Sequence, residues 1–439
     1  VWINELMNYY KIPGMAVGIV YDQNLVYSKG FGFADLNKKT AVTDETLFRI
    51  ASITKLFTGT AIMQLRDEGK LKLDDPVEKY LNWFRLKNPF GDIKKVTIRQ
   101  ILTHTSGIPR EAAFPYWTDS KFPTLDEIEE TIDDQSMIFR PETEWKYSNL
   151  GISLLGEIIE VVSGISYEDY VTLKILRPLE MENTKVQIDK HDPMLATGYL
   201  HKWESGKREV APFTDSKGIT AAANMSTNIK DLAKFCSLQF LYSDSLQNSI
   251  LKSSTLMEMH RVHWIRSGWK SGWGLAFATF KDEDQLYVGH AGWVAGFRSQ
   301  LLFNPDDKVG VIVFINAEDY SPYKIANQLY KLIAGPLKKI YGQSSDQYEF
   351  DSSWEKFTGK YVDPTHWYTD VIILNKKLYF YDYNHPPSDN PNSNLILLYP
   401  EGENLFRMKD GNGEIVKFEL NDEGSVKRIK RGENYTYPL

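Results

Sequence analysis

The sequence of 439 residues contains one cysteine, Cys236, which excludes an internal disulfide framework and a metal site built from several cysteines. No run of about 18 apolar residues occurs, so the sequence predicts no membrane-spanning helix. Basic residues are not in excess: 51 Lys and Arg against 58 Asp and Glu give a formal net charge of −7, which argues against a nucleic-acid partner. No secretory leader is visible, and we expect a cytoplasmic protein, although the sequence starts at Val1 and not at a methionine.

Two catalytic sequence patterns are missing as well. Neither G-x-S-x-G nor a glycine-rich phosphate loop occurs, which argues against an α/β-hydrolase and against nucleotide use. His260 and His263 are spaced like two metal ligands, but no carboxylate pattern accompanies them, so we assign no metal and no cofactor. What is present is the composition of an ordinary globular protein, with 42% hydrophobic and 25% charged residues.

Apolar periodicity predicts an α+β fold in the first three quarters of the chain. A short helix (residues 2–10) precedes two strands of a hairpin (residues 15–36), and a helix follows Ser52 and closes at Gly69. The next stretch, about residues 60–260, has mostly helical and loop patterns.

Strand patterns return between residues 271 and 316, and a last helix is expected to end at Gly335-Pro336. Hairpin, helical insertion, strand meander and helix in this order predict an antiparallel sheet flanked by helices, with a large helical subdomain beside it.

The pattern changes again near residue 345. Residues 343–350 read as a polar link, and the segment that follows alternates apolar and polar residues between regularly spaced turns. We therefore divide the chain into a domain of residues 1–344 and a small antiparallel barrel of residues 345–439.

Ser52 and Lys55 are the first candidate chemistry. At positions i and i+3 of a helix start they share a face, so the lysine amine can reach the serine hydroxyl. A serine needs a base to become a nucleophile, and a lysine can act as one only if burial or a nearby cation lowers its pKa. The plainer alternative is a helix-capping serine beside a solvated lysine. The pattern S-x-x-K recurs at four other serines and decides nothing alone.

Two further stretches favour the catalytic interpretation of Ser52 and Lys55 over the capping one. Residues 144–156 contain Y-x-N at the start of an apolar helix, and residues 288–299 contain H-x-G inside the strand meander. With the S-x-x-K pair, they resemble the three-part site of the serine β-lactamase and penicillin-binding superfamily. The similarity is to the branch of D-Ala-D-Ala carboxypeptidase B, D-aminopeptidase and class C β-lactamase. Residues 73–81, 102–109 and 225–235 resemble accessory signatures of the family, in the usual order.

The resemblance implies a role for each matching residue. Ser52 is similar to the nucleophile and Lys55 to the lysine beside it, while Tyr147 matches the tyrosine that shuttles the proton. His290 stands where the third motif begins. We expect it to be neutral within the proton relay, with activity rising from about pH 5 to 7 as an ordinary imidazole titrates.

The family's substrate contacts match three further residues. Asn149 corresponds to the amide that holds the substrate backbone and the lysine, Gly292 to the glycine that lets the substrate approach the strand, and Trp293 to the second backbone donor of the oxyanion hole. Ala291 departs from the family, which often has a hydroxyl residue there, and this weakens the expected anchor for a substrate carboxylate. Lys270-Ser271-Gly272 also fits the third motif, but its place in the chain favours His290.

The resemblance implies a serine peptidase that forms an acyl-enzyme and hydrolyses peptides containing D-amino acids, in carboxypeptidase, aminopeptidase or endopeptidase mode. An esterase of the same superfamily and a non-catalytic ligand-binding relative are the alternatives. F-x-G-x-Y at residues 357–361 resembles the start of the lipocalin-like domain found in this branch. In layout the chain is similar to archaeal self-compartmentalising D-amino-acid-specific peptidases, so we expect a homo-oligomer with a peptide substrate and no nucleic-acid or membrane partner.

Overall fold

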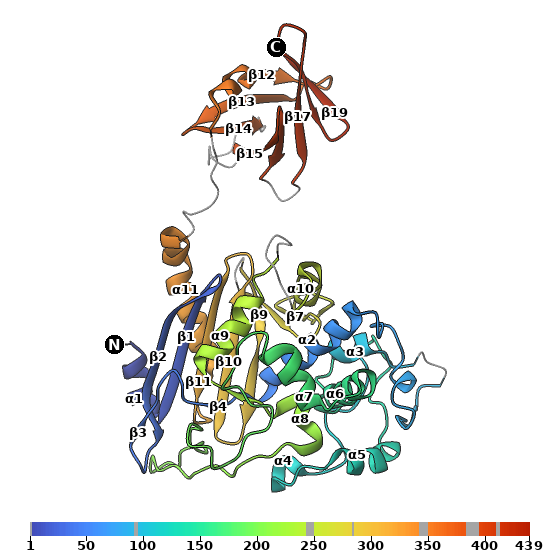
Figure 1. Ribbon diagram of the computed structural model, residues 1–439, viewed down its shortest axis with the longest axis vertical. Coiled ribbons are helices and arrows are strands. Elements are labelled where there is room, and N and C mark those ends of the chain that lie inside the picture. The colour runs from blue at the N-terminus through green and yellow to red at the C-terminus, as the bar shows by residue number, and fades with distance from the viewer. Residues whose placement is uncertain are drawn as a thin grey trace. The chain divides into compact units, whose positions relative to one another are not determined.

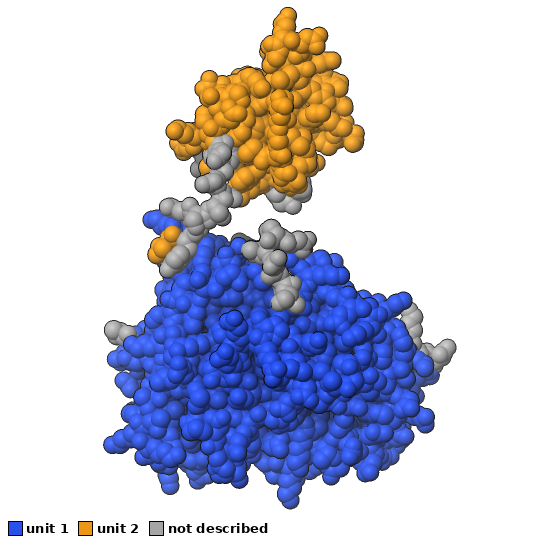
Figure 2. Space-filling model, viewed as in Figure 1, with its two compact units in different colours: residues 1–339 blue, residues 340–439 orange. Residues whose placement is uncertain are grey.

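The computed structural model describes residues 2–91, 95–242, 250–282, 285–341, 350–382, 395–409 and 413–439. The chain forms two compact units, residues 1–339 and 340–439, which are coloured separately in Figure 2. The polar link expected at residues 343–350 lies, apart from Phe350, outside the described residues.

The first unit is built on an antiparallel sheet, in which nine strands belong to the described residues (Figure 1). In order across the sheet they are β3 (Thr40–Ala41), β2 (Asn24–Asp35), β1 (Gly14–Tyr21), β11 (Val309–Ile315), β10 (Phe297–Asn304), β9 (Gln285–Val294), β8 (Ala278–Asp282), β7 (Ser271–Trp273) and β6 (Trp264–Ile265). The central strands β1 and β11 are buried on both faces because each face has its own hydrophobic core.

One core lies under the two terminal helices of the unit, α1 (Trp2–Tyr10) and α11 (Pro322–Tyr341). Alternate side chains of β1 divide between the cores: Met15 and Val17 face α1 and α11, whereas Ala16 and Val20 belong to the larger core on the other face. Figure 1 shows α1 and α11 on the side of the sheet opposite to the helical part. The predicted sheet flanked by helices is confirmed.

The helical part covers the second face and carries most of the larger core. Its helices are α2 (Thr54–Asp67), α3 (Ile98–Leu102), α4 (Tyr116–Asp119), α5 (Leu125–Thr131), α6 (Asn149–Ser163), α7 (Tyr167–Val171), α8 (Thr220–Ala223), α9 (Ile229–Leu238) and α10 (Ser253–His260). A two-stranded ladder of β4 (Phe48–Arg49) and β5 (Ser226–Thr227) ties the segment before α2 to the segment before α9.

Helix α6 shows how the sequence sets its own boundaries. Ser148 caps its N-terminus by accepting a hydrogen bond from the backbone N–H of Gly151 at 2.8 Å, and Gly164 ends it in the left-handed conformation at φ 77°. The apolar residues between them are almost all buried. The cap and the buried side chains fix where the helix begins, and therefore fix the position of its first residue, Asn149.

Strand β9 has a free edge. β8 pairs with it only as far as Gly289, and β9 continues to Val294 with β10 on its other side. No strand among the described residues pairs with the outer edge of His290–Val294. The backbone there is open to a ligand that approaches in an extended conformation.

The last helix of the first unit is longer than the sequence predicts. We expected it to end at Gly335-Pro336, but α11 runs through Pro336 to Tyr341. Pro336 lies on the exposed side, and Leu337 continues the apolar stripe of α11 against the core. Burial of that stripe outweighs the backbone hydrogen bond that the proline removes.

The second unit is a closed antiparallel barrel, as predicted, with eight strands among the described residues. They are β12 (Gly359–Val362), β13 (Tyr368–Leu374), β14 (Lys377–Asp382), β15 (Leu395–Gly402), β16 (Leu405–Met408), β17 (Ile415–Leu420), β18 (Val426–Arg431) and β19 (Asn434–Pro438). β12 pairs with β19, which closes the barrel. A 3₁₀ segment, η6 (Ser352–Phe357), contributes Trp354 and Phe357 to its core.

By length and composition, no single helix within the described ranges could cross a membrane, whereas α6 with the segment Tyr167–Leu176 passes the same test as a pair bent by 80°.

Candidate active site

Ser52 lies in a 3₁₀ turn, η1 (Ala51–Ile53), immediately before α2. Ala51 before it has a φ of 46°, a left-handed conformation that is uncommon for a residue with a Cβ. Strand β9 packs directly against this turn. A Cβ on Gly292 would lie 2.1 Å from the carbonyl oxygen of Ile50, so only glycine lets the strand come this close to Ser52.

Lys55 lies within the first turn of α2, and its side chain is fully buried. Its Nζ donates to Asn149 Oδ1 at 2.8 Å and to the carbonyl oxygen of Ala222 at 2.7 Å, and it lies 3.2 Å from Ser52 Oγ. Burial holds the pKa of the Lys55 amine well below its ordinary value, which shifts the amine toward the neutral form that a base requires.

The neighbours of Lys55 determine where its lone pair points. A neutral amine has two N–H bonds and one lone pair. Because the Asn149 and Ala222 oxygens can only accept, both N–H bonds of Lys55 are committed to them, and the lone pair is left for Ser52 Oγ. The Ser52 hydroxyl can therefore donate its proton to Lys55, which is the activation that a serine nucleophile needs.

Tyr147 brings a second hydroxyl group to Ser52. Burial raises the pKa of the tyrosine above its ordinary value, and this effect is larger than the opposite effect of the nearby Ser52 side chain. Lys55 Nζ lies 4.8 Å from the centre of the Tyr147 ring, and the ring of His104 lies 4.5 Å away between centroids. A phenol that stays protonated is suited to passing a proton on, and not to holding a negative charge.

His290 lies on β9, with its ring centroid 6.1 Å from that of Tyr147. Its Nδ1 is 2.6 Å from the carbonyl oxygen of Ala291, which only accepts, so Nδ1 carries the proton and Nε2 presents a lone pair. Burial, followed by the nearby Lys55, lowers the pKa of His290 to about 3. The imidazole is therefore neutral from pH 5 upwards, and an activity rise between pH 5 and 7 cannot come from its titration, contrary to our expectation from the sequence.

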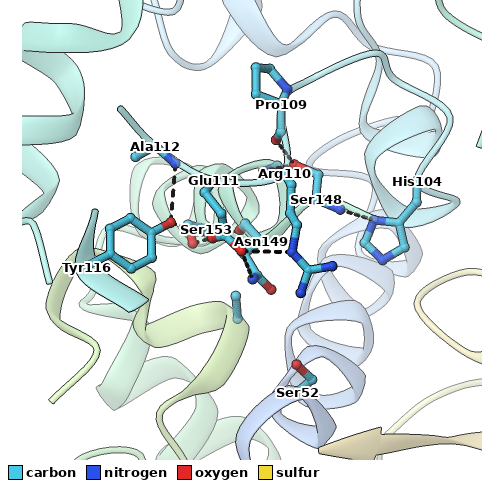
Figure 3. Close-up of polar contacts among 12 residues, drawn as sticks. Ser52, His104, Pro109, Arg110, Glu111, Ala112, Tyr116, Ser148, Asn149 and Ser153 are labelled. Carbon is cyan, nitrogen blue, oxygen red and sulfur yellow. Dashed lines mark hydrogen bonds and ion pairs between the residues drawn. The ribbon is translucent and has the colours of Figure 1, made fainter. Parts of the chain in front are cut away.

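Asn149 stands at the N-terminus of α6, and both ends of its amide are engaged. Oδ1 accepts from Lys55, and Nδ2 donates to Glu111 Oε1 at 2.7 Å. Glu111 Oε1 also accepts from Arg110 Nε at 3.0 Å, as Figure 3 shows. Asn149 holds the lysine as the resemblance implies, while its contact with a substrate backbone stays a prediction.

Sequence reasoning missed Arg110 and Glu111. They directly follow the accessory signature of residues 102–109, and this adjacency is the feature of the sequence that could have pointed to them. Several hydrogen bonds join the loop to the segment that leads into α6; among them, Lys146 N donates to His104 O, Ser148 N to His104 Nδ1, and Asn149 N to Arg110 O. The loop therefore carries Glu111 to Asn149 (Figure 3).

A cleft of about 530 Å³ opens at these groups. Six of the seven predicted site residues line it, and the seventh, Lys55, is buried against two of them; the six are Ser52, Tyr147, Asn149, His290, Gly292 and Trp293. The alternative third motif, Lys270-Ser271-Gly272, does not line the cleft, and Lys270 is exposed.

The remaining walls of the cleft are aromatic and cationic. Trp117 from the helical part stacks on Trp293 of β9, with centroids 6.3 Å apart and planes inclined by 17°. Arg110, Lys146 and Arg298 line the cleft, and among the described residues no carboxylate side chain does so. Arg298 Nε is buried and has no hydrogen-bond partner in the described part of the chain.

The fold and the site together define a class: an antiparallel sheet beside a helical subdomain, with a serine, a buried lysine and a tyrosine at their junction. The chain belongs to the β-lactamase family, whose sequence model matches residues 2–335. Protein flp of Staphylococcus aureus (strain NCTC 8325 / PS 47) is 32% identical over 316 residues, which are 71% of this chain and 61% of that protein. The chain thus spans about three fifths of the length of this relative.

Solved structures agree on the fold. An octameric penicillin-binding protein homologue from Pyrococcus abyssi is 28% identical with a TM-score of 0.67, covering 99% of this chain and 98% of that one. This similarity therefore includes the barrel. The D-alanine carboxypeptidase AmpC from Burkholderia cenocepacia is 22% identical with a TM-score of 0.62, over 75% of this chain and 97% of that one, and it shows the fold alone.

Proposed function

We propose that this protein is a serine hydrolase that works through an acyl-enzyme on Ser52, and that it hydrolyses peptides containing D-amino acids. The observation that carries the proposal is the environment of Lys55. Its two N–H bonds are held by acceptors and its lone pair is left for Ser52 Oγ, 3.2 Å away. A lysine so placed is a base, and not a charged surface group.

In the proposed reaction Ser52 Oγ gives its proton to Lys55 Nζ as it attacks the substrate carbonyl carbon. The negative charge moves to the carbonyl oxygen, which the backbone N–H groups of Ser52 and Trp293 would stabilise. The tetrahedral intermediate then breaks its bond to the leaving group, which takes a proton from Tyr147, and Tyr147 regains one from Lys55. Water then attacks the acyl-enzyme, the proton transfers run in the reverse direction, and the acid is released.

The lining of the cleft favours a substrate that carries a negative charge and apolar side chains. Three cations and several tryptophans line it, and a peptide with a free carboxylate would complement both. Arg298, whose Nε is buried without a partner in the described part of the chain, is our choice for the group that binds this carboxylate. The D-configuration rests on the resemblance to D-Ala-D-Ala carboxypeptidases and D-aminopeptidases.

An esterase is the second candidate, and the aromatic walls of the cleft favour it because an acyl chain of a simple ester also packs well there. We further propose that the protein forms a homo-oligomer. The support for this is the octameric homologue from Pyrococcus abyssi, which is similar over nearly the whole chain.

The test uses purified protein and its Ser52→Ala variant with three substrates: a D-residue peptide, its L-diastereomer and a p-nitrophenyl ester. A peptidase for D-residues cleaves the first and not the second, whereas an esterase turns over only the third. Loss of the nucleophile is expected to cost several orders of magnitude, up to about 10⁶. If Ser52→Ala keeps more than about a tenth of the activity, the acyl-enzyme proposal is wrong.

A further inference from the structure

We propose that Glu111 is a positioning residue: its carboxylate fixes the Asn149 amide with Oδ1 toward Lys55, and thereby directs the lone pair of Lys55 at Ser52. This inference rests on the proposed function, since it explains how the base of that reaction is oriented. It assigns Glu111 no contact with substrate.

An amide side chain is almost symmetric in shape, so its neighbours must determine which end faces which way. Glu111 Oε1 lies 2.7 Å from Asn149 Nδ2, and a carboxylate can only accept a hydrogen bond. Rotating the amide would set two acceptor oxygens against each other at this distance. Glu111 therefore permits one orientation, the one in which Oδ1 lies 2.8 Å from Lys55 Nζ.

The orientation of Asn149 matters because of what the opposite one would do to Lys55. An N–H of Asn149 would then point at the amine, and neutral Lys55 would have to use its lone pair to accept it. One N–H of Lys55 would be left to face Ser52 Oγ, and no base would remain there. A rotation of one amide is thus enough to disable the proposed nucleophile without moving it.

Glu111 is itself held on both oxygens, and Figure 3 shows these contacts. Oε1 accepts from Arg110 Nε at 3.0 Å, and Oε2 accepts from the Tyr116 hydroxyl at 2.5 Å. The Glu111 carbonyl oxygen accepts from Gln135 Nε2 at 2.9 Å. A carboxylate with this many donors is rigid and already occupied, which suits a positioning role and not that of an acid or base.

Arg110 also removes an electrostatic conflict. An uncompensated carboxylate near Lys55 would favour the ammonium form and take the base away. Burial has the largest effect on the pKa of Lys55 and lowers it. The charge of Glu111 raises this pKa and that of Arg110 lowers it, each by less than burial does. The ion pair thus lets Glu111 orient Asn149 while burial still lowers the pKa of Lys55.

The test measures the rate at which a fluorophosphonate labels Ser52, by intact-mass spectrometry between pH 5 and 9. Glu111→Met removes the acceptor and should slow labelling by about 10- to 100-fold, a typical cost of misplacing a reacting group. Glu111→Gln can still accept from Asn149 and should label within about threefold of wild type. Its acidic limb should move to lower pH, because removing the Glu111 charge lowers the pKa of Lys55. Glu130→Met, at an exposed position on α5, is the matched control and should label like wild type.

A double-mutant cycle separates positioning from general damage. On an Asn149→Ala background, Glu111→Met should cause no further loss, because the amide that it orients is absent. An equal loss on both backgrounds would overturn the inference, as would wild-type labelling by Glu111→Met or a glutamine variant with an unmoved acidic limb. If wild type does not label at Ser52, the proposed function fails, which is a separate result from an unaffected Glu111 variant.

Discussion

The contact between β9 and the turn that carries Ser52 makes a sharp prediction for Gly292→Ala. The added Cβ would lie 2.1 Å from the Ile50 carbonyl oxygen and 2.2 Å from Ser299 Oγ. The hydroxyl can rotate away, but the carbonyl belongs to the backbone. Strand and turn must therefore move apart.

The size of the effect follows from these distances. Ordinary van der Waals contact begins at 3.4 Å, so the backbone must yield by about 1.3 Å, some of it at Ser52. A misplacement of about 1 Å at a reacting group commonly costs about 10²-fold in rate. We expect Gly292→Ala to lower the rate of Ser52 labelling by about this factor while the protein still unfolds cooperatively.

The assay compares labelling rates by a small fluorophosphonate and thermal unfolding curves. Gly335→Ala in α11 is the control, because nothing lies within 4 Å of its added Cβ. If Gly292 only admits the substrate backbone, as the family resemblance implies, Gly292→Ala should label normally with a small reagent and show a raised KM for peptides. Labelling of Gly292→Ala within about threefold of wild type would refute the packing argument.

Other expected outcomes concern the cleft and the second unit. His290→Gln should leave the shape of the kcat/KM profile between pH 5 and 8 unchanged, because a group with a pKa of about 3 does not titrate there; a lost inflection would contradict its neutral state. Arg298→Met should raise KM about 10- to 100-fold for peptides with a free carboxylate and leave it unchanged for their amides, as read from initial rates. A chain ending at residue 341 should fold and label at Ser52 at the full rate; a folded but unlabelled product would show that the barrel supplies catalytic groups. Phe357→Ala, in the barrel core, should lower the free energy of unfolding of the second unit by about 3–5 kcal/mol in denaturant titrations, without changing labelling.

The sequence predicted the fold because its elements carry local signals. The helix after Ser52 closes near Gly69 as expected, and the barrel follows from period-two alternation. The helix expected to end at Gly335-Pro336 did not, since local proline chemistry was outweighed by burial of Leu337 against a core that sequence alone does not reveal.

The candidate site was predictable to the extent that each residue belongs to a spaced motif. Ser52 and His290, for example, can be found from the sequence because each belongs to a motif of characteristic spacing. Glu111 does not, because its relation to Asn149 depends on how the loop of residues 104–112 packs on α6. The pKa of His290 likewise depends on burial that only the assembled fold creates.

The pairing at the centre of the sheet has a consequence for biosynthesis. Met15 of β1 pairs with Ile315 of β11, three hundred positions later. At about 5–20 residues per second, the ribosome delivers β11 some 15 to 60 seconds after β1, and β1 is apolar on both faces during that wait. Strand β9, which completes the cleft, also emerges at the end of this interval. We therefore expect a newly made chain to acquire a reactive Ser52 only when the sheet closes, so that reactivity at this serine marks the completion of folding of the first unit.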